Sequence, residues 1–246
     1  MLSRPLAAAA AALLALAFAG CGGNGDDAAA PPVTTAAAEQ PAVEFPVTIE
    51  AANGSVVLEE RPDRIVSLSP TATESLFAIG AGEQVIAVDD QSNFPAEAPV
   101  TDLSGFQPNI EAIAGHEPDL VVAGFDPGGL VDGLEQVGVT VLLQPAAADL
   151  EEAFGQIEEL GAATGHATEA DELVEEMDVK IDELAAAAAV DAEGLSVYHE
   201  LGPDFFSATS QTFIGSIYEL LGLENIADEA GAEAPDYPQL SAEYIL

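Results

Sequence analysis

The sequence is poor in positive charge. Its 246 residues contain 4 Lys and Arg against 44 Asp and Glu, which gives a formal net charge of −40. Because such a chain repels phosphate backbones and anionic lipid headgroups, its charge argues against nucleic acid as a partner and against direct membrane binding. Self-repulsion on this scale favours a monomer, and it leads to the hypothesis that the protein is adapted to a saline environment.

Residue types that carry common chemistries are also scarce. Cys21 is the only cysteine, so an intramolecular disulfide and a thiolate metal cluster are both excluded. The three histidines, His116, His166 and His199, include no His-x-x-x-His pair, which argues against a metal site of the protein's own. The sequence has neither a Gly-x-Ser-x-Gly elbow nor a phosphate loop. We therefore expect no catalytic residues, no cofactor and no enzymatic activity.

The N-terminal segment has the parts of an export signal. Arg4 precedes an apolar stretch from Leu6 to Phe18, which is too short to span a bilayer as a permanent helix. The residues Leu16 to Gly20 and Cys21 resemble a bacterial lipobox, whose cysteine is lipidated. We predict a signal peptide over 1–20, lipid on Cys21, and a flexible Ala-, Gly-, Pro- and Thr-rich tether over 21–44. An ordinary signal peptide with an incidental cysteine is the alternative.

The segment 45–148 has the pattern of an α/β lobe. Two alternating runs flank the Asn53-Gly54 step, which favours a β-hairpin. Strands are expected at 65–69, 84–88, 119–123 and 139–143, and helices at 71–79, 110–114 and 129–136. Because short buried strands alternate with helices, the pattern predicts a parallel sheet.

The remaining chain predicts a linking helix and a second, smaller lobe. A helical pattern covers 149–189 with an interruption at 161–165. A strand at 195–198 and helices at 212–221 and 241–246 follow. The fold class is therefore α/β, with an N-terminal lobe over 45–148, a bridging helix over 149–190 and a C-terminal lobe over 191–246. The second lobe has about half the elements of the first, so we expect it to be truncated.

The segment Arg64 to Gly80, RIVSLSPTATESLFAIG, resembles the metal-chelate class of periplasmic solute-binding proteins, which includes vitamin B12 and ferric-siderophore binders. Further segments agree in the same order. They are Asn93 to Pro95, Leu103 to Ile113, Glu117 to Ala123, Leu160 to Gly165, Thr212 to Gly215, and Leu221 to Ala227. The resemblance implies two α/β lobes joined by a long helix, with the ligand held in the cleft between them.

Within that class the ligand cleft is built from loops that follow strand ends, where aromatic faces and backbone donors converge. The matching candidates are Ser69, Pro70, Asn93, Phe94, Phe106 and Phe125 in the first lobe and His199, Phe205 and Phe206 in the second. Aromatic faces suit a corrin, a haem or a catechol-type chelate, although any single Phe is more often a core residue. No Arg or Lys falls in an expected cleft loop, so a neutral or cationic chelate such as a corrinoid fits better than an anionic one.

The resemblance also implies two acidic residues that dock on the transporter. They are Glu74 and Glu219, which match positions that meet arginines of the permease in the family. For Glu74 the competing interpretation is a capping box with Thr71, in which Glu74 reaches back to the start of the helix. For Glu219 it is an ordinary solvated acid.

The sequence therefore predicts an extracytoplasmic, lipid-anchored solute-binding protein. It would capture a metal chelate, either a corrinoid such as vitamin B12 or a ferric siderophore or haem, and deliver it to an ABC permease dimer with its ATPases. An envelope sensor or surface-binding module of the same fold is the alternative. An envelope hydrolase is a more remote one, because abundant carboxylates alone do not define an active site.

Overall fold

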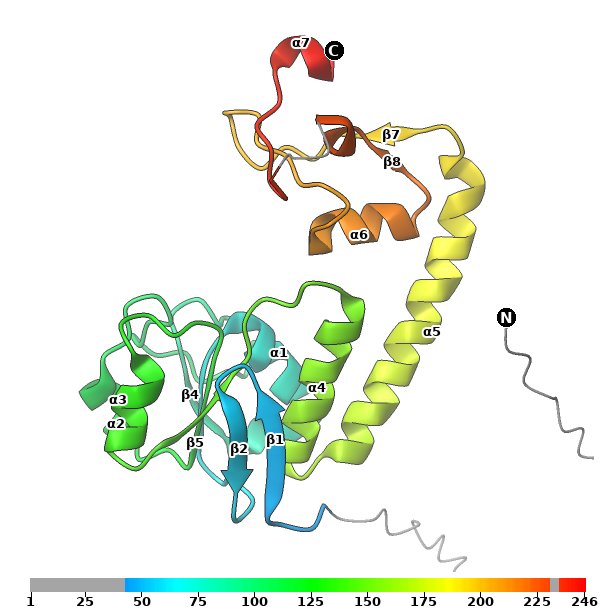
Figure 1. Cartoon of the computed structure of the whole chain (residues 1–246). Helices are drawn as coiled ribbons and strands as arrows, with labels where there is room; N and C mark the ends of the chain where they lie inside the picture. Colours follow the sequence, from blue (N-terminus) through cyan, green and yellow to red (C-terminus); the bar gives the residue numbers. More distant parts are fainter. Residues whose placement is uncertain (1–42, 231–234) are drawn as a thin grey trace, which may run out of the picture. The chain divides into compact units, whose positions relative to one another are not determined.

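The computed structural model describes residues 43–230 and 235–246 (Figure 1). The predicted signal peptide, Cys21 and nearly all of the predicted tether lie outside this part of the chain. Within it, none of the helices has both the length and the apolar character needed to cross a membrane.

The fold opens with the predicted β-hairpin. Strand β1 (Val47–Ala51) pairs antiparallel with β2 (Gly54–Leu58). Gly54 has a φ of 101°, a left-handed conformation that glycine adopts without steric cost. The side chain of Asn53 donates to the carbonyl oxygen of Val141 and accepts from the backbone nitrogen of Leu143, both at 3.0 Å. The turn therefore fastens the hairpin to the edge of the main sheet.

The predicted parallel sheet is confirmed. Its strands are β3 (Ile65–Leu68), β4 (Val85–Val88), β5 (Leu120–Ala123) and β6 (Thr140–Leu143), in the order β4-β3-β5-β6. Every residue of β3 and β5 is buried, as expected for central strands that are covered on both faces.

Helices cover the two faces of this sheet (Figure 1). Successive strand residues point to opposite faces, so Leu120 and Val122 of β5 enter one apolar core while Val121 and Ala123 enter another. The first core also contains residues of the hairpin, of α1 (Pro70–Ala78) and of α4 (Leu150–Thr164). The second contains residues of α2 (Ile110–Ala114) and α3 (Leu130–Gln136).

The long helical stretch is confirmed, but its break is narrower than predicted. Helix α4 ends at Thr164, and α5 (Ala167–Ala192) begins after Gly165 and His166. Gly161, expected inside the break, belongs to α4. A Cβ atom at this position would collide with the Cβ of Ala170, so glycine is present because α4 and α5 pack closely here.

The C-terminal part contains the predicted strand and helices. Strand β7 (Ser196–Val197) pairs in parallel with β8 (Glu224–Asn225). Helix α6 (Phe213–Leu220) begins after Thr212, whose hydroxyl accepts from the backbone nitrogen of Gly215 at 3.1 Å. Helix α7 (Ala242–Ile245) follows the Ser241 cap. Two short 3-10 helices, Ala81–Gln84 and Ile226–Ala230, complete the described elements.

Candidate ligand-binding site

The carboxyl edge of the parallel sheet brings the first-lobe candidates together. In the sheet, β4 lies on one side of β3, and β5 and then β6 lie on the other. The direction in which successive strands are added therefore reverses between β3 and β5. Crevices at such switch points are the usual ligand sites of open parallel sheets. Ser69 and Pro70 follow β3 and Phe125 follows β5, so these candidates flank the switch point.

Ser69 is the N-cap residue of α1 at this edge. Its side chain is buried, and its hydroxyl oxygen accepts a hydrogen bond from the backbone nitrogen of Ala72 at 3.4 Å, which caps α1. Pro70 is exposed at the first position of the helix, where the missing N–H of proline costs nothing. The competing interpretation of Thr71 and Glu74 as a capping box is therefore wrong, because Ser69 is the cap and Thr71 lies inside the helix.

Phe106 and Phe125 form an aromatic pair at the same edge. Their ring centroids are 5.3 Å apart with an interplanar angle of 31°, and the side chains are 64% and 52% exposed. The preceding residue, Gly105, holds Phe106 in place. A Cβ atom on Gly105 would lie 2.6 Å from the carbonyl oxygen of Leu68 and 2.8 Å from a carboxylate oxygen of Asp89. Only glycine lets this loop approach the end of β3 so closely.

Asn93 and Phe94 extend the edge beyond β4. Both are exposed, Phe94 by 63%. The turn before them is fixed by Asp89, a buried carboxylate that accepts from the backbone nitrogen of Ser92 at 3.0 Å and from its hydroxyl at 2.6 Å. Sequence reasoning missed Asp89, although an Asp directly after a buried strand with a Ser three residues later is a recognisable turn signal.

The second-lobe candidates Phe205 and Phe206 lie on a backbone-pinned loop. They are 38% and 43% exposed, so neither is a core residue. The carbonyl oxygen of Phe205 accepts from the nitrogen of Leu240 at 3.0 Å, and that of Phe206 from Leu201 at 2.8 Å. Phe205 has a φ of 62°, a strained conformation for a bulky residue that persists only where its surroundings enforce it.

His199 is half-buried and already engaged. Its Nδ1 lies 2.8 Å from the hydroxyl oxygen of Tyr218, on α6, and the two ring centroids are 5.7 Å apart. This contact orients the imidazole. Tyr218 was not singled out from the sequence, because only the fold brings α6 beside the segment after β7.

Within the described part of the chain, three hydroxyl groups without a hydrogen-bond partner lie close in sequence to the second-lobe candidates His199, Phe205 and Phe206. The side-chain oxygens of Tyr198, Ser207 and Thr209 are buried and have no hydrogen-bond partner among the described residues. Desolvation, followed by the negative charge of Glu200, raises the pKa of Tyr198 above its usual value. The phenol of Tyr198 therefore stays a neutral donor at physiological pH.

The predicted docking residues Glu74 and Glu219 are both exposed on helices. Glu74 lies on α1 and Glu219 in the last turn of α6. Neither carboxylate forms a hydrogen bond or an ion pair within the described part of the chain. Both are therefore available to a partner.

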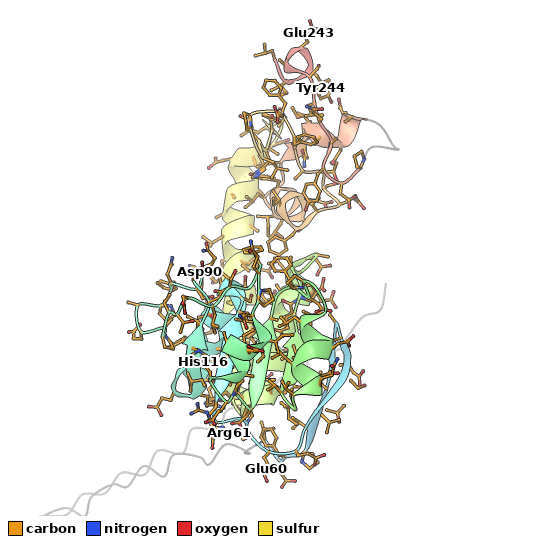
Figure 2. The ribbon with its side chains drawn as sticks, turned by 90° about the vertical axis from the view of Figure 1, so that its left-hand side faces the viewer. Glu60, Arg61, Asp90, His116, Glu243 and Tyr244 are labelled. Atoms are coloured by element: carbon orange, nitrogen blue, oxygen red, sulfur yellow. The ribbon has the colours of Figure 1, made fainter. Side chains whose placement is uncertain are left out.

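The first-lobe cations lie at the amino edge of the sheet, away from the aromatic pair. Arg61 donates to the carbonyl oxygen of Thr164, the last residue of α4, at 2.8 Å. Arg64, just before β3, donates to the carbonyl oxygens of His116 and Glu117, which precede β5. Figure 2 shows Arg61 toward one end of this lobe and Asp90 toward the other, with His116 between them. Across residues 43–230 and 235–246, no cluster of His, Cys, Asp and Glu side chains is arranged to hold a metal ion.

A hollow of about 860 Å³ lies elsewhere, chiefly between α4 and α5. Its floor includes Phe154, Val174 and Ile181. Its rim carries the carboxylates of Glu151, Glu158, Asp171, Glu175, Asp178 and Asp182. The candidate ligand site is at the strand ends instead, where the exposed Phe106–Phe125 pair lies beside the switch point.

The switch point of an open parallel sheet is where α/β proteins of this kind usually bind ligands. Residues 65–246 match the model of the periplasmic binding protein family, so the chain belongs to that family. The family is one of solute-binding proteins rather than enzymes.

Two relatives and one solved structure illustrate the similarity. A cobalamin-binding protein of Halobacterium salinarum is 33% identical over 212 residues, which cover 83% of this chain and 57% of that protein. An uncharacterised ABC transporter substrate-binding lipoprotein of Bacillus subtilis is 32% identical over 220 residues, covering 85% and 68%. A possible iron-binding periplasmic solute-binding protein of Staphylococcus epidermidis shares the fold, with a TM-score of 0.66, 24% identity and coverage of 76% and 74%. The chain thus spans little more than half the length of the halobacterial relative.

Proposed function

We propose that this protein is an extracytoplasmic solute-binding lipoprotein that captures a metal chelate and delivers it to an ABC importer. The observation that carries the proposal is the exposed Phe106–Phe125 pair beside the switch point of the sheet. Family membership and the cobalamin-binding relative support a chelate as the ligand. A corrinoid such as vitamin B12 is the first candidate, and haem and ferric siderophores are the others.

The physical basis is burial of rigid aromatic surface. Large aromatic side chains bury about 150–250 Å² each when fully covered, and roughly half of each ring of this pair is exposed. Covering the exposed half of both rings with a flat macrocycle would contribute about 4–6 kcal/mol at roughly 25 cal/mol per Å². Phe94, Phe205 and Phe206 would add contacts from their own loops.

Delivery would use the two exposed carboxylates. Glu74 and Glu219 would each meet cationic residues on one permease subunit, as the family pattern implies. Exposed ion pairs contribute about 0.2–1 kcal/mol each, so they set orientation and encounter rate more than affinity. That suits a partner from which the binding protein must be released.

Anchoring would come from lipid on Cys21. The net charge of −40 keeps the folded part away from anionic headgroups, so a covalent anchor is the means that would hold it near the permease. The same self-repulsion favours a monomer at the membrane surface.

Ligand retention tests the proposal. The full-length protein is mixed with cobalamin, haem and several ferric siderophores, desalted, and examined by absorbance and thermal melting. A coloured one-to-one complex with a raised Tm is expected, because a ligand that binds only the native state stabilises it. If no chelate is retained and none shifts the Tm, the proposal is wrong.

A further inference from the structure

Among the residues that the structure describes, the two arginines of the first lobe lie at the opposite edge of the sheet from the aromatic pair. The sequence has 4 Lys and Arg residues, of which Arg4 precedes the predicted lipidation site. Arg61 and Arg64 bind backbone carbonyl groups at the amino edge of the sheet. Lys180 lies on α5, where its ammonium group is 3.8 Å from the carboxylate of Glu183. The aromatic residues therefore have no cationic side chain among their sequence neighbours.

Carboxylates accompany the aromatic loops instead. Asp126 follows Phe125 in the sequence, and its Oδ1 accepts from the backbone nitrogen of Val131 at 3.0 Å, which ties the carboxylate to the start of α3. The backbone nitrogen of Asp90 donates to the carbonyl oxygen of Leu103 at 2.9 Å, which joins Asp90 to the loop that carries Phe106. Both acids are exposed, and Figure 2 shows Asp90 at the end of the lobe away from Arg61.

The second-lobe loop repeats this arrangement. Asp204 directly precedes Phe205, and its backbone carbonyl accepts from Gln239 at 2.9 Å. The sequence contains no Lys or Arg after Lys180, so the whole C-terminal part is anionic. Each lobe thus presents exposed aromatic rings with carboxylates next to them.

We infer that the ligand site selects chelates by charge, with Asp90 and Asp126 as specificity-determining residues that exclude anionic chelates and favour neutral or cationic ones. The inference rests on the proposed function, because it concerns the same site. A carboxylate-bearing chelate entering this edge would lose its hydration beside fixed negative charges and would find no Arg or Lys to pair with. A cationic chelate would gain from the same charges.

The expected size of the effect follows from Coulomb's law. Two unit charges about 4 Å apart in a water-like medium interact by roughly 1 kcal/mol, which is about fivefold in Kd. The interaction is screened over about 10 Å at roughly 0.1 M salt and over shorter distances at higher salt. Each unit of ligand charge should therefore change Kd by about fivefold at low salt and by less in strong salt.

The test uses chelates that share one skeleton and differ in charge. The corrin series comprises aquocobalamin, which is positive, cyanocobalamin, which is neutral, and cyanocobalamin with one side-chain amide hydrolysed to a carboxylate. The ferric series comprises one trihydroxamate whose terminal group is a protonated amine, a neutral acetamide or a carboxylate. Kd is measured with the full-length protein at low and high salt. Within the series that is retained, affinity should fall from positive to neutral to negative, and the differences should shrink as salt rises.

Variants separate charge selection from other effects. Asp126→Asn keeps an oxygen that can accept from Val131 while removing the charge, and Asp90→Asn removes the second charge. The double variant should narrow the spread of Kd values across a series. Glu83 is an exposed acid before β4, at the opposite edge of the sheet, so Glu83→Gln is the control and should leave this spread unchanged. The imidazole of His199 could replace the axial water of aquocobalamin and so tighten its binding without any effect of charge. His199→Ala removes this route, and in that variant the neutral corrin should still bind more tightly than the negative one.

Two outcomes would overturn the inference. Equal or tighter binding of the anionic member in a retained series contradicts charge selection but leaves the proposed function standing. Failure to retain any member of either series contradicts the proposed function, and the inference falls with it.

Discussion

Asp89 holds Ser92 through two hydrogen bonds, one from the backbone nitrogen at 3.0 Å and one from the hydroxyl at 2.6 Å. The carboxylate is buried at the carboxyl end of β4, and the turn that it closes leads directly into Asn93 and Phe94. A buried acid with no role in ligand contact thus positions part of the candidate site.

Replacing Asp89 with Ala should loosen this turn. The backbone nitrogen of Ser92 would lose its side-chain acceptor, so we expect a loss of about 1–3 kcal/mol in the free energy of unfolding, together with weaker chelate binding. Urea unfolding and ligand titration measure the two effects. Asp89→Asn, which keeps an acceptor oxygen, is the matched control and should lose less. Equal stability of the Ala variant and the wild type would show that the turn does not depend on this carboxylate.

Gly105→Ala tests the close approach that places Phe106. The added Cβ would lie 2.6 Å from the carbonyl oxygen of Leu68, so the loop must shift. We expect a destabilisation of about 1–3 kcal/mol, as for other overpacked sites, and a loss of chelate affinity. Gly155→Ala is the control, because nothing lies within 4 Å of a Cβ at that position in α4. Alanine there should raise stability by up to about 1 kcal/mol.

Glu74→Gln and Glu219→Gln test docking separately from ligand capture. Both side chains are exposed, so chelate affinity and Tm should stay at wild-type values. Loss of one exposed ion pair should weaken association with the permease by up to about fivefold, and the wild-type interaction should weaken with salt. Binding to the reconstituted permease measures this effect. Unchanged association of the double variant would remove both residues from the docking surface.

Much of the first lobe could be predicted because its strands are short apolar runs buried on both faces, and such runs are visible in a sequence. Thr71 was considered as a cap of α1 only in the alternative interpretation of Glu74. Ser69 and Thr71 both suit a helix start, and only the backbone shows that Ser69 precedes the first turn. Gly161 was misplaced for a similar reason: glycine marks a break or a close contact equally well, and the contact with Ala170 is tertiary. The turn signal of Asp89 was visible in the sequence, but only the fold shows that its carboxylate is buried and bound to Ser92.

The pKa of Tyr244 should make the C-terminal part sensitive to alkali. Desolvation, the charge of Glu229 and a hydrogen bond to that carboxylate at 3.3 Å raise this pKa above its usual value of about 10. Because the pKa of Tyr244 is higher in the folded state than in the unfolded state, its neutral phenol contributes to the stability of the fold. This contribution is complete below about pH 10 and is lost as the pH rises through the folded-state pKa. Phenolate absorbance during an alkaline titration should show late-titrating tyrosines, Tyr198 and Tyr244, and Tyr244→Phe should remove one of the two. A normal titration of all tyrosines would contradict this account.

Binding at the aromatic pair is the central claim, and the Kd of the retained chelate in Phe106→Ala/Phe125→Ala tests it most directly. Val137→Ala, which truncates an apolar side chain that is 57% exposed at the far end of α3, is the control. The account predicts that the double variant keeps its fold and loses at least tenfold in affinity, about 1.4 kcal/mol, while the control binds like the wild type. Wild-type affinity in the double variant would contradict the placement of the ligand at this edge of the sheet.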